Sequence, residues 1–272
     1  MGEANNNTRG GRAMATVYSP EEEFHLKIRP GDVGRYVLLC GDPARTEKIA
    51  AYFDDAAFLK SNREYTIWTG TLEGEKVAAC STGIGGPSNA IAIEELIHCG
   101  ADTFIRIGSA GGMAPEVIGG DVVIATGAIR MEGTTYEYAP AEYPAVADYG
   151  IVSALVDAAK EDAVPYHVGV LHNKDNFYGQ HSPDTMPVRE KLKGKWQAFL
   201  DCGALASEME AAALFIISAV RRARAGCIVQ VFANQTRRAM GLNDPMTLDM
   251  DPAIRVGVHG LRRLILQDRA AR

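Results

Sequence analysis

Apolar residues along this chain fall alternately into short continuous runs and into longer stretches with helical spacing. The short runs have the length of β-strands and cover residues 36–40, 68–72, 76–81, 103–107, 121–126, 166–171 and 227–233. The stretches with helical spacing cover residues 44–53, 89–99, 151–163, 207–225 and 252–267, and the fourth of these is the longest. Strands that alternate with helices, without a linker rich in Pro or Ser, predict one α/β domain whose sheet carries helices on both faces.

Turn residues between these segments indicate where the elements begin and end. Asp42 and Pro43 suit the N-cap and the first position of the helix that follows the first strand. Residues 73–75, Glu-Gly-Glu, predict a hairpin turn between two strands. Residues 1–18 are rich in Asn, Gly and Arg and predict a flexible leader, so the single domain is expected to cover residues 19–272.

Composition and charge exclude several classes of protein. Of the 272 residues, 47% are hydrophobic and 23% are charged, the balance of a globular protein, so disorder is excluded as the main state. The formal net charge of −6 disfavours a nucleic-acid binder, and an anionic ligand would need arginines gathered at its own site. Five widely spaced cysteines form no CxxC pair, so we expect a reducing, cytoplasmic location without zinc or disulfides. No apolar run suits a signal peptide or a membrane span, so no membrane association is expected.

Arg106 lies inside an apolar run, between Ile105 and Ile107. A buried charge without a partner costs several kcal/mol, so this guanidinium requires an anion, which is either a carboxylate of the chain or a bound ligand. The glycine-rich turn at residues 108–112 offers backbone N–H groups and the Ser109 hydroxyl to the same anion. The turn lacks the Gly-Lys-Ser/Thr of a P-loop, so an anion site and a structural ion pair both stay open for Arg106.

A second strand-to-helix turn, Gly41–Arg45, offers similar chemistry. A helix N-terminus presents free N–H groups and a partial positive charge, which suit a phosphate, and Arg45 adds a full charge. The alternative is a capped helix start with a solvated arginine. The glycine-rich segment Cys80–Ser88 also joins a strand to a helix, and it is either a backbone surface at a ligand or subunit contact, or only a tight connection.

Two carboxylates, Glu208 and Glu210, flank Met209 at the start of the predicted helix 207–225. A carboxylate can accept hydrogen bonds from both hydroxyls of a ribose. Ser207 and Glu210 also match the S-x-x-E pattern of a capping box, in which Glu210 would only satisfy backbone N–H groups of its own helix. These two roles for Glu210 compete with each other.

Six segments in chain order together resemble the nucleoside phosphorylase family, and within it the members that cleave uridine. They are Gly41–Arg45, Asn62–Tyr65, Cys80–Ser88, Phe104–Gly111, Phe177–Gln180 and Glu208–Ala211. The resemblance implies a single-domain, three-layer α/β/α fold with a central mixed β-sheet, assembled at least as a homodimer with shared active sites. It also implies reversible phosphorolysis of uridine to uracil and ribose 1-phosphate in pyrimidine salvage, with inorganic phosphate as co-substrate and no required cofactor.

The resemblance also implies roles for particular residues. The expected phosphate-binding residues are Gly41, Arg45, Arg106, Ser109 and, from a neighbouring subunit, Arg63. The expected ribose-binding residues are Met209, Glu210 and, across the dimer interface, His25. The residues expected to bind the base are Phe177, Gln180 and Gln235. Those expected to be catalytic are Arg45, Arg106, Gln180 and Glu210, and a monovalent cation between subunits is expected at Glu64, Ile84 and Ser88.

The chain departs from the family pattern at two positions that belong to base recognition. Ser182 and Gln235 stand where the family commonly has arginines that hold a uracil carbonyl and the charge on the leaving base. Gln235, His181, Arg237 and Arg238 are the candidates to replace those arginines. Base specificity therefore stays open, and the alternatives are a purine nucleoside phosphorylase, a nucleosidase that uses water, and a non-catalytic nucleoside-binding relative. Several arginines at one site favour phosphate over water.

Overall fold

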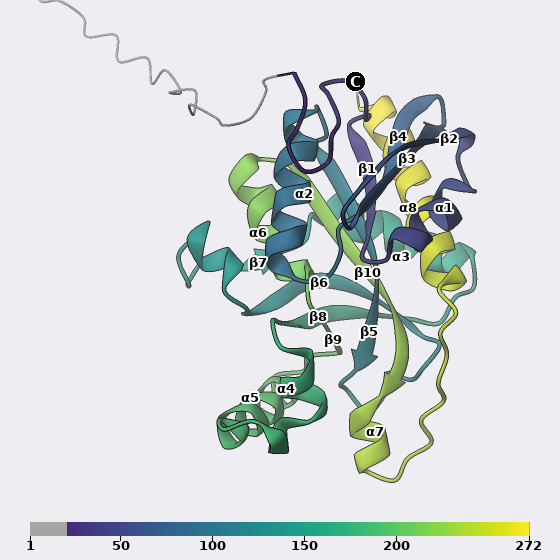
Figure 1. Cartoon of the computed structure of the whole chain (residues 1–272). Helices are drawn as coiled ribbons and strands as arrows, with labels where there is room; N and C mark the ends of the chain where they lie inside the picture. The colour runs from purple at the N-terminus through teal and green to yellow at the C-terminus, as the bar shows by residue number, and fades with distance from the viewer. Residues whose placement is uncertain (1–20, 272) are drawn as a thin grey trace, which may run out of the picture.

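The computed structural model describes residues 21–271, so the leader predicted for residues 1–18 lies outside the described residues. The strands are β1 Tyr36–Cys40, β2 Asp54–Asn62, β3 Tyr65–Leu72, β4 Glu75–Ser81, β5 Thr103–Gly112, β6 Val122–Met131, β7 Ala145–Val146, β8 Tyr166–Lys174, β9 Ala206–Glu208 and β10 Arg224–Asn234. The α-helices are α1 Pro43–Ala50, α2 Gly86–His98, α3 Tyr149–Glu161, α4 Phe177–His181, α5 Arg189–Asp201, α6 Ala211–Arg221, α7 Gln235–Ala239 and α8 Asp251–Ala270. Figure 1 shows these elements gathered around one central sheet.

The strands form one sheet with both parallel and antiparallel pairings. β1 is parallel to its neighbours β4 and β5, and β5 is parallel to β10. β4, β3 and β2 follow one another as antiparallel neighbours at one end of the sheet. At the other end β10 pairs with β6, β6 with β8, and β8 with β9. Because β9 returns to pair with β5, the strands from β5 to β10 close into a ring that resembles a small barrel.

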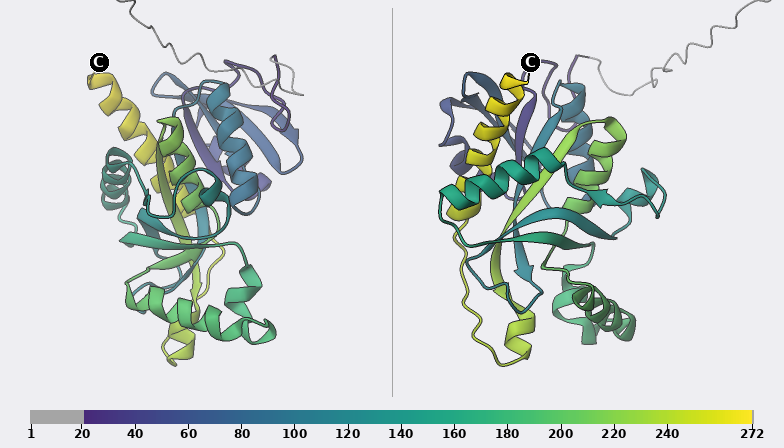
Figure 2. Two further views of the ribbon diagram at one scale, coloured as in Figure 1. Left: turned by 90° about the vertical axis from the view of Figure 1, so that its left-hand side faces the viewer. Right: turned by 180° about the vertical axis from the view of Figure 1, so that it is seen from behind.

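Alternate residues of the central strand show why helices cover both faces. Tyr36, Leu38 and Cys40 of β1 are buried in one hydrophobic cluster together with side chains of α1, α3 and α8. Val37 and Leu39 are buried in a second cluster with side chains of α2 and α6. Since successive side chains of a strand point to opposite faces, the two clusters lie on the two sides of the sheet. Figures 1 and 2 show the resulting layers, and the predicted three-layer α/β/α architecture with a mixed sheet is confirmed.

Local chemistry explains the boundaries of the elements that lead into the site. Asp42 caps α1 as predicted, because its side chain accepts a hydrogen bond from Ala44 N at 3.0 Å and Pro43 occupies the first turn. The strands β5 and β8 continue beyond their predicted ends, to Gly112 and Lys174. Their last residues are glycine or polar, so the apolar pattern stops before the strand pairing does.

The long helix predicted over residues 207–225 is wrong. Residues Ala206–Glu208 form β9, the helix α6 covers only Ala211–Arg221, and the chain re-enters the sheet at Arg224. Arg222 adopts a left-handed conformation with φ of 60° and ends the helix. This stretch is apolar on all sides because it is buried, and a pattern without periodicity cannot mark where a strand becomes a helix. The longest helix of the described residues is α8.

The strand β2 and the helix α5 were not predicted at all. No residue of α5 is buried, and the side chains of β2 are mostly exposed. Such segments carry no apolar face, so the hydrophobic pattern gives no signal for them.

Gly226 of β10 gives a test of the packing between the sheet and α3. A Cβ at this position would lie 2.2 Å from Ile151 Cγ2. Because a β-branched side chain has little rotamer freedom in a helix, α3 would have to move, and we expect Gly226→Ala to lower the free energy of unfolding by about 1–3 kcal/mol. Urea denaturation followed by circular dichroism measures this change.

The matched control is Gly194→Ala in α5, where an added Cβ meets nothing within 4 Å. Alanine is the better helix former, so this variant is expected to gain roughly 0.5–1 kcal/mol. Equal stability of the two variants would contradict the packing described for Gly226.

Candidate active site

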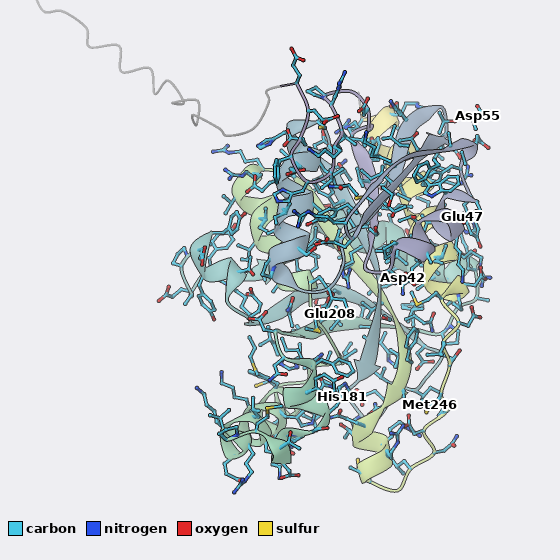
Figure 3. All side chains as sticks on the ribbon, in the orientation of Figure 1. Asp42, Glu47, Asp55, His181, Glu208 and Met246 are labelled. Carbon is cyan, nitrogen blue, oxygen red and sulfur yellow. The ribbon has the colours of Figure 1, made fainter. Side chains whose placement is uncertain are left out.

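The ends of several strands converge on one cavity of about 810 Å³. Most of its lining residues lie at or just beyond the carboxyl ends of β1, β4, β5, β8, β9 and β10, the edge at which α/β folds bind ligands. Helix α4 and the loop that precedes α8 complete the wall. Figure 3 labels four residues of this cavity that come from separate elements, Asp42, Glu208, His181 and Met246.

Arg106 reaches the cavity from the middle of β5. Gly108 leaves room for it, because a Cβ at Gly108 would lie 3.2 Å from Arg106 Nη2. Nη2 donates to Glu210 Oε2, and Nε lies 3.4 Å from Glu208 Oε2. Burial alone would lower the pKa of Arg106, but these two carboxylates outweigh burial and raise it. Nη1 is buried without a hydrogen-bond partner in residues 21–271, so the guanidinium is ion-paired on one side and still has donors for a bound anion.

Arg45 lines the same cavity from the first turn of α1. Its Nη1 donates to Ile107 O at 3.3 Å, and it takes part in no ion pair within the described part of the chain. Burial lowers the pKa of Arg45, and the positive charge of Arg106 acts in the same direction. An arginine remains protonated under these conditions. Of the two neighbouring guanidiniums of Arg45 and Arg106, only that of Arg106 is balanced by carboxylates, an arrangement that suits an oxyanion.

The other residues expected at a phosphate divide into two groups. Gly41 and Ser109 line the cavity beside the arginines. Arg63 does not: it is exposed between β2 and β3, in a left-handed turn with φ of 54°. His25 also lies outside the lining, and its Nδ1 is 2.6 Å from Glu95 Oε1. These two are the residues that the resemblance assigns to a neighbouring subunit.

Glu210 is buried between a glycine-rich loop and Arg106. Its Oε1 accepts a hydrogen bond from Gly85 N at 2.7 Å, while its Oε2 accepts from the guanidinium. The capping box considered for Ser207 and Glu210 is absent, because Ser207 lies in β9 and the Glu210 carboxylate makes no cap hydrogen bond to α6. Met209 lines the cavity next to it. The carboxylate therefore faces the site and not its own helix.

Glu208 caps α6, the role that was considered as the alternative for Glu210. Its carboxylate accepts hydrogen bonds from Glu210 N at 2.8 Å and from Ala211 N at 3.0 Å, at the start of α6. Burial and the charge of Glu210 raise the pKa of Glu208, and the guanidinium of Arg106 opposes this shift. Sequence analysis gave Glu208 no role, although a second carboxylate two positions from Glu210 in an apolar stretch was a signal for it.

Lys174 is a charged cavity residue that sequence analysis missed. It is the last residue of β8 and is 4% exposed. Its Nζ donates to Ser207 Oγ at 2.8 Å and to Glu208 O at 3.5 Å. Burial lowers the pKa of Lys174 to about 8, although nearby carboxylates act in the opposite direction. Its neighbours Asn173 and Asp175 make the segment resemble a polar turn, so no pattern in the sequence indicated a buried charge.

The residues expected to bind a base lie together at Lys174. Phe177 and Gln235 line the cavity, and Gln180 lines an adjoining cavity of about 240 Å³. Gln180 Oε1 accepts from Ser207 Oγ at 2.8 Å, and its Nε2 donates to Gln235 Oε1 at 3.2 Å. Lys174 lines both cavities, so its buried ammonium lies beside the residues that are expected to bind the base.

The candidates to replace the family arginines do not all face the cavity. His181, Arg238 and Gln235 line it, whereas Ser182 does not. Arg237 is held outside the lining by a hydrogen bond from its Nε to a backbone carbonyl at 2.6 Å. The Arg238 guanidinium is paired with a carboxylate at 2.8 Å.

The three residues expected at a cation lie close together at the edge of the cavity. Ser88 Oγ donates to Glu64 Oε1 at 2.8 Å, and a Cβ at Gly83 would lie 2.9 Å from Glu64 Cγ. Ile84 is 76% exposed and lines the cavity. Carboxylate and hydroxyl oxygens suit a hard cation, so these residues fit the expected ion, and the site stays a prediction.

Two features are absent from the described residues. Residues 21–271 contain no group of three or more His, Cys, Asp and Glu side chains that could hold a metal ion. In the same part of the chain, no helix combines the length and the apolar character that a membrane crossing needs.

Comparison with known proteins gives the family to which this chain belongs. The family model of the phosphorylase superfamily matches residues 35–247. The uridine phosphorylase of Treponema pallidum is 54% identical, over 94% of this chain and 99% of the relative. The uridine phosphorylase of Klebsiella aerogenes is 40% identical, over 91% of this chain and 100% of the relative. The guanosine phosphorylase of Halorubrum lacusprofundi is 40% identical, over 77% of this chain and 83% of the relative. The chain therefore belongs to the phosphorylase superfamily.

The lowered pKa of Lys174 predicts how stability depends on pH. The folded-state pKa of about 8 lies below the ordinary value of 10.5, so between these pH values the unfolded chain binds more protons than the folded chain. Stability therefore rises with pH in this interval. We expect the wild type to gain stability relative to Lys174→Met between pH 8 and pH 10, by at most roughly 3 kcal/mol.

Urea denaturation of both proteins at a series of pH values measures this difference. Lys160→Met, on the exposed face of α3, corrects for the loss of one lysine charge. A difference between wild type and Lys174→Met that stays constant with pH would contradict the buried amine.

Proposed function

We propose that this chain catalyses the reversible phosphorolysis of uridine to uracil and ribose 1-phosphate. One observation carries the proposal: a single cavity holds Arg45 and Arg106, which suit phosphate, Glu210, which suits a ribose, and Phe177 with Lys174, which suit a base. The identity of 54% with a uridine phosphorylase, over nearly the full length of both chains, supports the same reaction.

The reaction needs no nucleophilic side chain, because phosphate itself attacks. A phosphate oxygen forms a bond to C1′ of the ribose, the bond from C1′ to N1 of uracil breaks, and its electron pair leaves with the base. Positive charge develops on the sugar and negative charge on the base. Arg45 and the free side of Arg106 would hold the phosphate beneath C1′, where its charge stabilises the sugar and its position removes the entropic cost of encounter.

Glu210 would bind the hydroxyls of the ribose. One of its oxygens already accepts from Gly85 N and the other from Arg106, and each has a further lone pair for a sugar hydroxyl. Because Arg106 contacts this carboxylate, the group that binds phosphate also fixes the group that binds the sugar. Met209 would pack against the ribose from the same segment.

Lys174 would stabilise the charge on the leaving base, as arginines commonly do in the family. Negative charge develops on uracil as the glycosidic bond breaks, and a buried ammonium stabilises such charge more than an exposed one does. Its pKa of about 8 also makes it a suitable proton donor for the departing base near neutral pH. Gln180 would form hydrogen bonds with the edge of the base, because its amide can both donate and accept.

We further propose a homodimer, at least, in which each site is completed by its partner subunit. His25 and Arg63 do not line the cavity of their own chain, and Arg63 is exposed. A monovalent cation at Glu64, Ile84 and Ser88 would lie next to this contact. We place the reaction in cytoplasmic pyrimidine salvage, with phosphate as co-substrate and no required cofactor.

Product analysis tests the reaction directly. The purified protein is incubated with uridine, thymidine and inosine, each with and without phosphate, and the sugar product is identified. We expect ribose 1-phosphate from uridine only when phosphate is present. Free ribose would instead show a nucleosidase, faster cleavage of inosine a purine phosphorylase, and no turnover a binding protein.

The same assay tests Arg106. Loss of one charged contact to the transition state costs about 10²–10³ in turnover, so we expect Arg106→Ala to lower kcat by that factor. The matched control is Arg221→Ala, because Arg221 pairs with Glu94 on the surface at 2.9 Å. Equal turnover of Arg106→Ala and the control would rule out Arg106 as a phosphate ligand.

A mixing experiment tests the shared site. Arg63→Ala and Arg106→Ala are co-expressed, so that a mixed dimer contains one site with both arginines and one with neither. We expect activity to recover to about a quarter of the wild type after random assembly, although each variant alone is nearly inactive. Activity equal to the mean of the two separate variants would show that Arg63 does not act across subunits.

A further inference from the structure

Ser207 connects the residues expected at the base, and no role in the reaction follows for it from the mechanism above. It lies in β9 between β5 and β8 and is 2% exposed. Three groups surround its hydroxyl: Lys174 Nζ at 2.8 Å, Gln180 Oε1 at 2.8 Å and His172 Nδ1 at 3.1 Å.

The structure gives the direction of two of these hydrogen bonds, and the third depends on the tautomer of His172. A hydroxyl donates one hydrogen bond and accepts two. An ammonium only donates, so Lys174 occupies one of the two lone pairs of Ser207. The hydroxyl proton goes to Gln180 Oε1, so the second lone pair accepts from His172 in the tautomer that carries its proton on Nδ1. The single donor and both acceptor lone pairs of the Ser207 hydroxyl are then used.

The second end of the Gln180 amide is also held. Its Nε2 donates to Gln235 Oε1 at 3.2 Å. A glutamine amide can normally turn by 180° at little cost, which exchanges its acceptor and its donor. Here Gln180 Oε1 faces the Ser207 hydroxyl and Gln180 Nε2 faces Gln235 Oε1. Turning the Gln180 amide would therefore also require His172 to change its tautomer and the Gln235 amide to turn. The amide keeps one lone pair and one N–H for a ligand.

We propose that Ser207 is a positioning residue that determines base specificity, because it fixes the orientation of the Gln180 amide. This inference rests on the proposed phosphorolysis of a pyrimidine nucleoside. Uracil presents an N3–H donor beside a carbonyl acceptor, whereas cytosine presents an N3 acceptor beside an amino donor. The two edges have the same shape and opposite polarity. A fixed amide matches only one of them and leaves buried polar groups unpaired against the other, whereas a freely turning amide can match both.

The test compares uridine and cytidine as substrates at saturating phosphate. We measure kcat/KM for both nucleosides with the wild type, Ser207→Ala and Ser207→Thr. One hydrogen bond corresponds to about a tenfold change in rate, so Ser207→Ala is expected to lower the ratio of uridine to cytidine by about tenfold or more. Ser207→Thr keeps the hydroxyl and is expected to restore most of the ratio.

Ser218→Ala is the matched control. Ser218 is a serine of α6 that is 1% exposed, and its hydroxyl has no hydrogen-bond partner among the described residues. Removal of this hydroxyl is expected to leave both rates and their ratio unchanged. Thermal unfolding of each variant establishes that the compared proteins are folded.

The outcomes separate this inference from the proposed function. A wild type that does not cleave uridine overturns the proposed function, and with it this inference, before any variant is made. If the wild type cleaves uridine but Ser207→Ala keeps the wild-type ratio, only the role of Ser207 is overturned. A ratio that falls equally in Ser207→Ala and Ser207→Thr also overturns it, because the hydroxyl would then not be the cause. A merely structural serine would slow both substrates alike and leave the ratio unchanged.

Discussion

The site depends on one buried charge, the guanidinium of Arg106 in the middle of a central strand. Such a charge is tolerated only where opposite charges and hydrogen bonds surround it. Glu208 and Glu210 provide both, and each is itself held by backbone N–H groups, Glu208 by the start of α6 and Glu210 by Gly85. The carboxylates that stabilise Arg106 therefore also fix a helix terminus and a glycine-rich loop. In the proposed site, fold stability and ligand binding would therefore depend on the same contacts.

The cavity carries more positive charge than its carboxylates neutralise. Burial lowers the pKa of Arg45 and of Lys174, which means that both cations lose hydration in the folded state. In the proposed reaction, an incoming phosphate would offset this cost at the arginines, and a base that departs with negative charge would offset it at the lysine. In the proposed reaction, this unbalanced charge would stabilise the negative charge that develops in the transition state of phosphorolysis.

Part of this arrangement could be predicted from the sequence, and the reasons differ by residue. Arg106 was found because a charge within an apolar strand needs a partner, and Asp42 because a helix start needs a cap. Lys174 carried no such signal, since it follows an apolar run among polar neighbours. The helix predicted over residues 207–225 failed because a segment buried on every side has no period, although it contains a strand, a cap and a helix.

The sequence by itself determined the alternation of strands and helices, the glycine-rich turns at strand ends and the candidate arginines, because these follow from local hydrophobicity, backbone freedom and the cost of a buried charge. Only the tertiary structure decided which partner each polar group takes. Closure of the strands from β5 to β10 brings Lys174, Ser207 and Gln180 together from three separate segments. Hydrogen bonds between residues distant in sequence depend on that closure, and no local pattern encodes it.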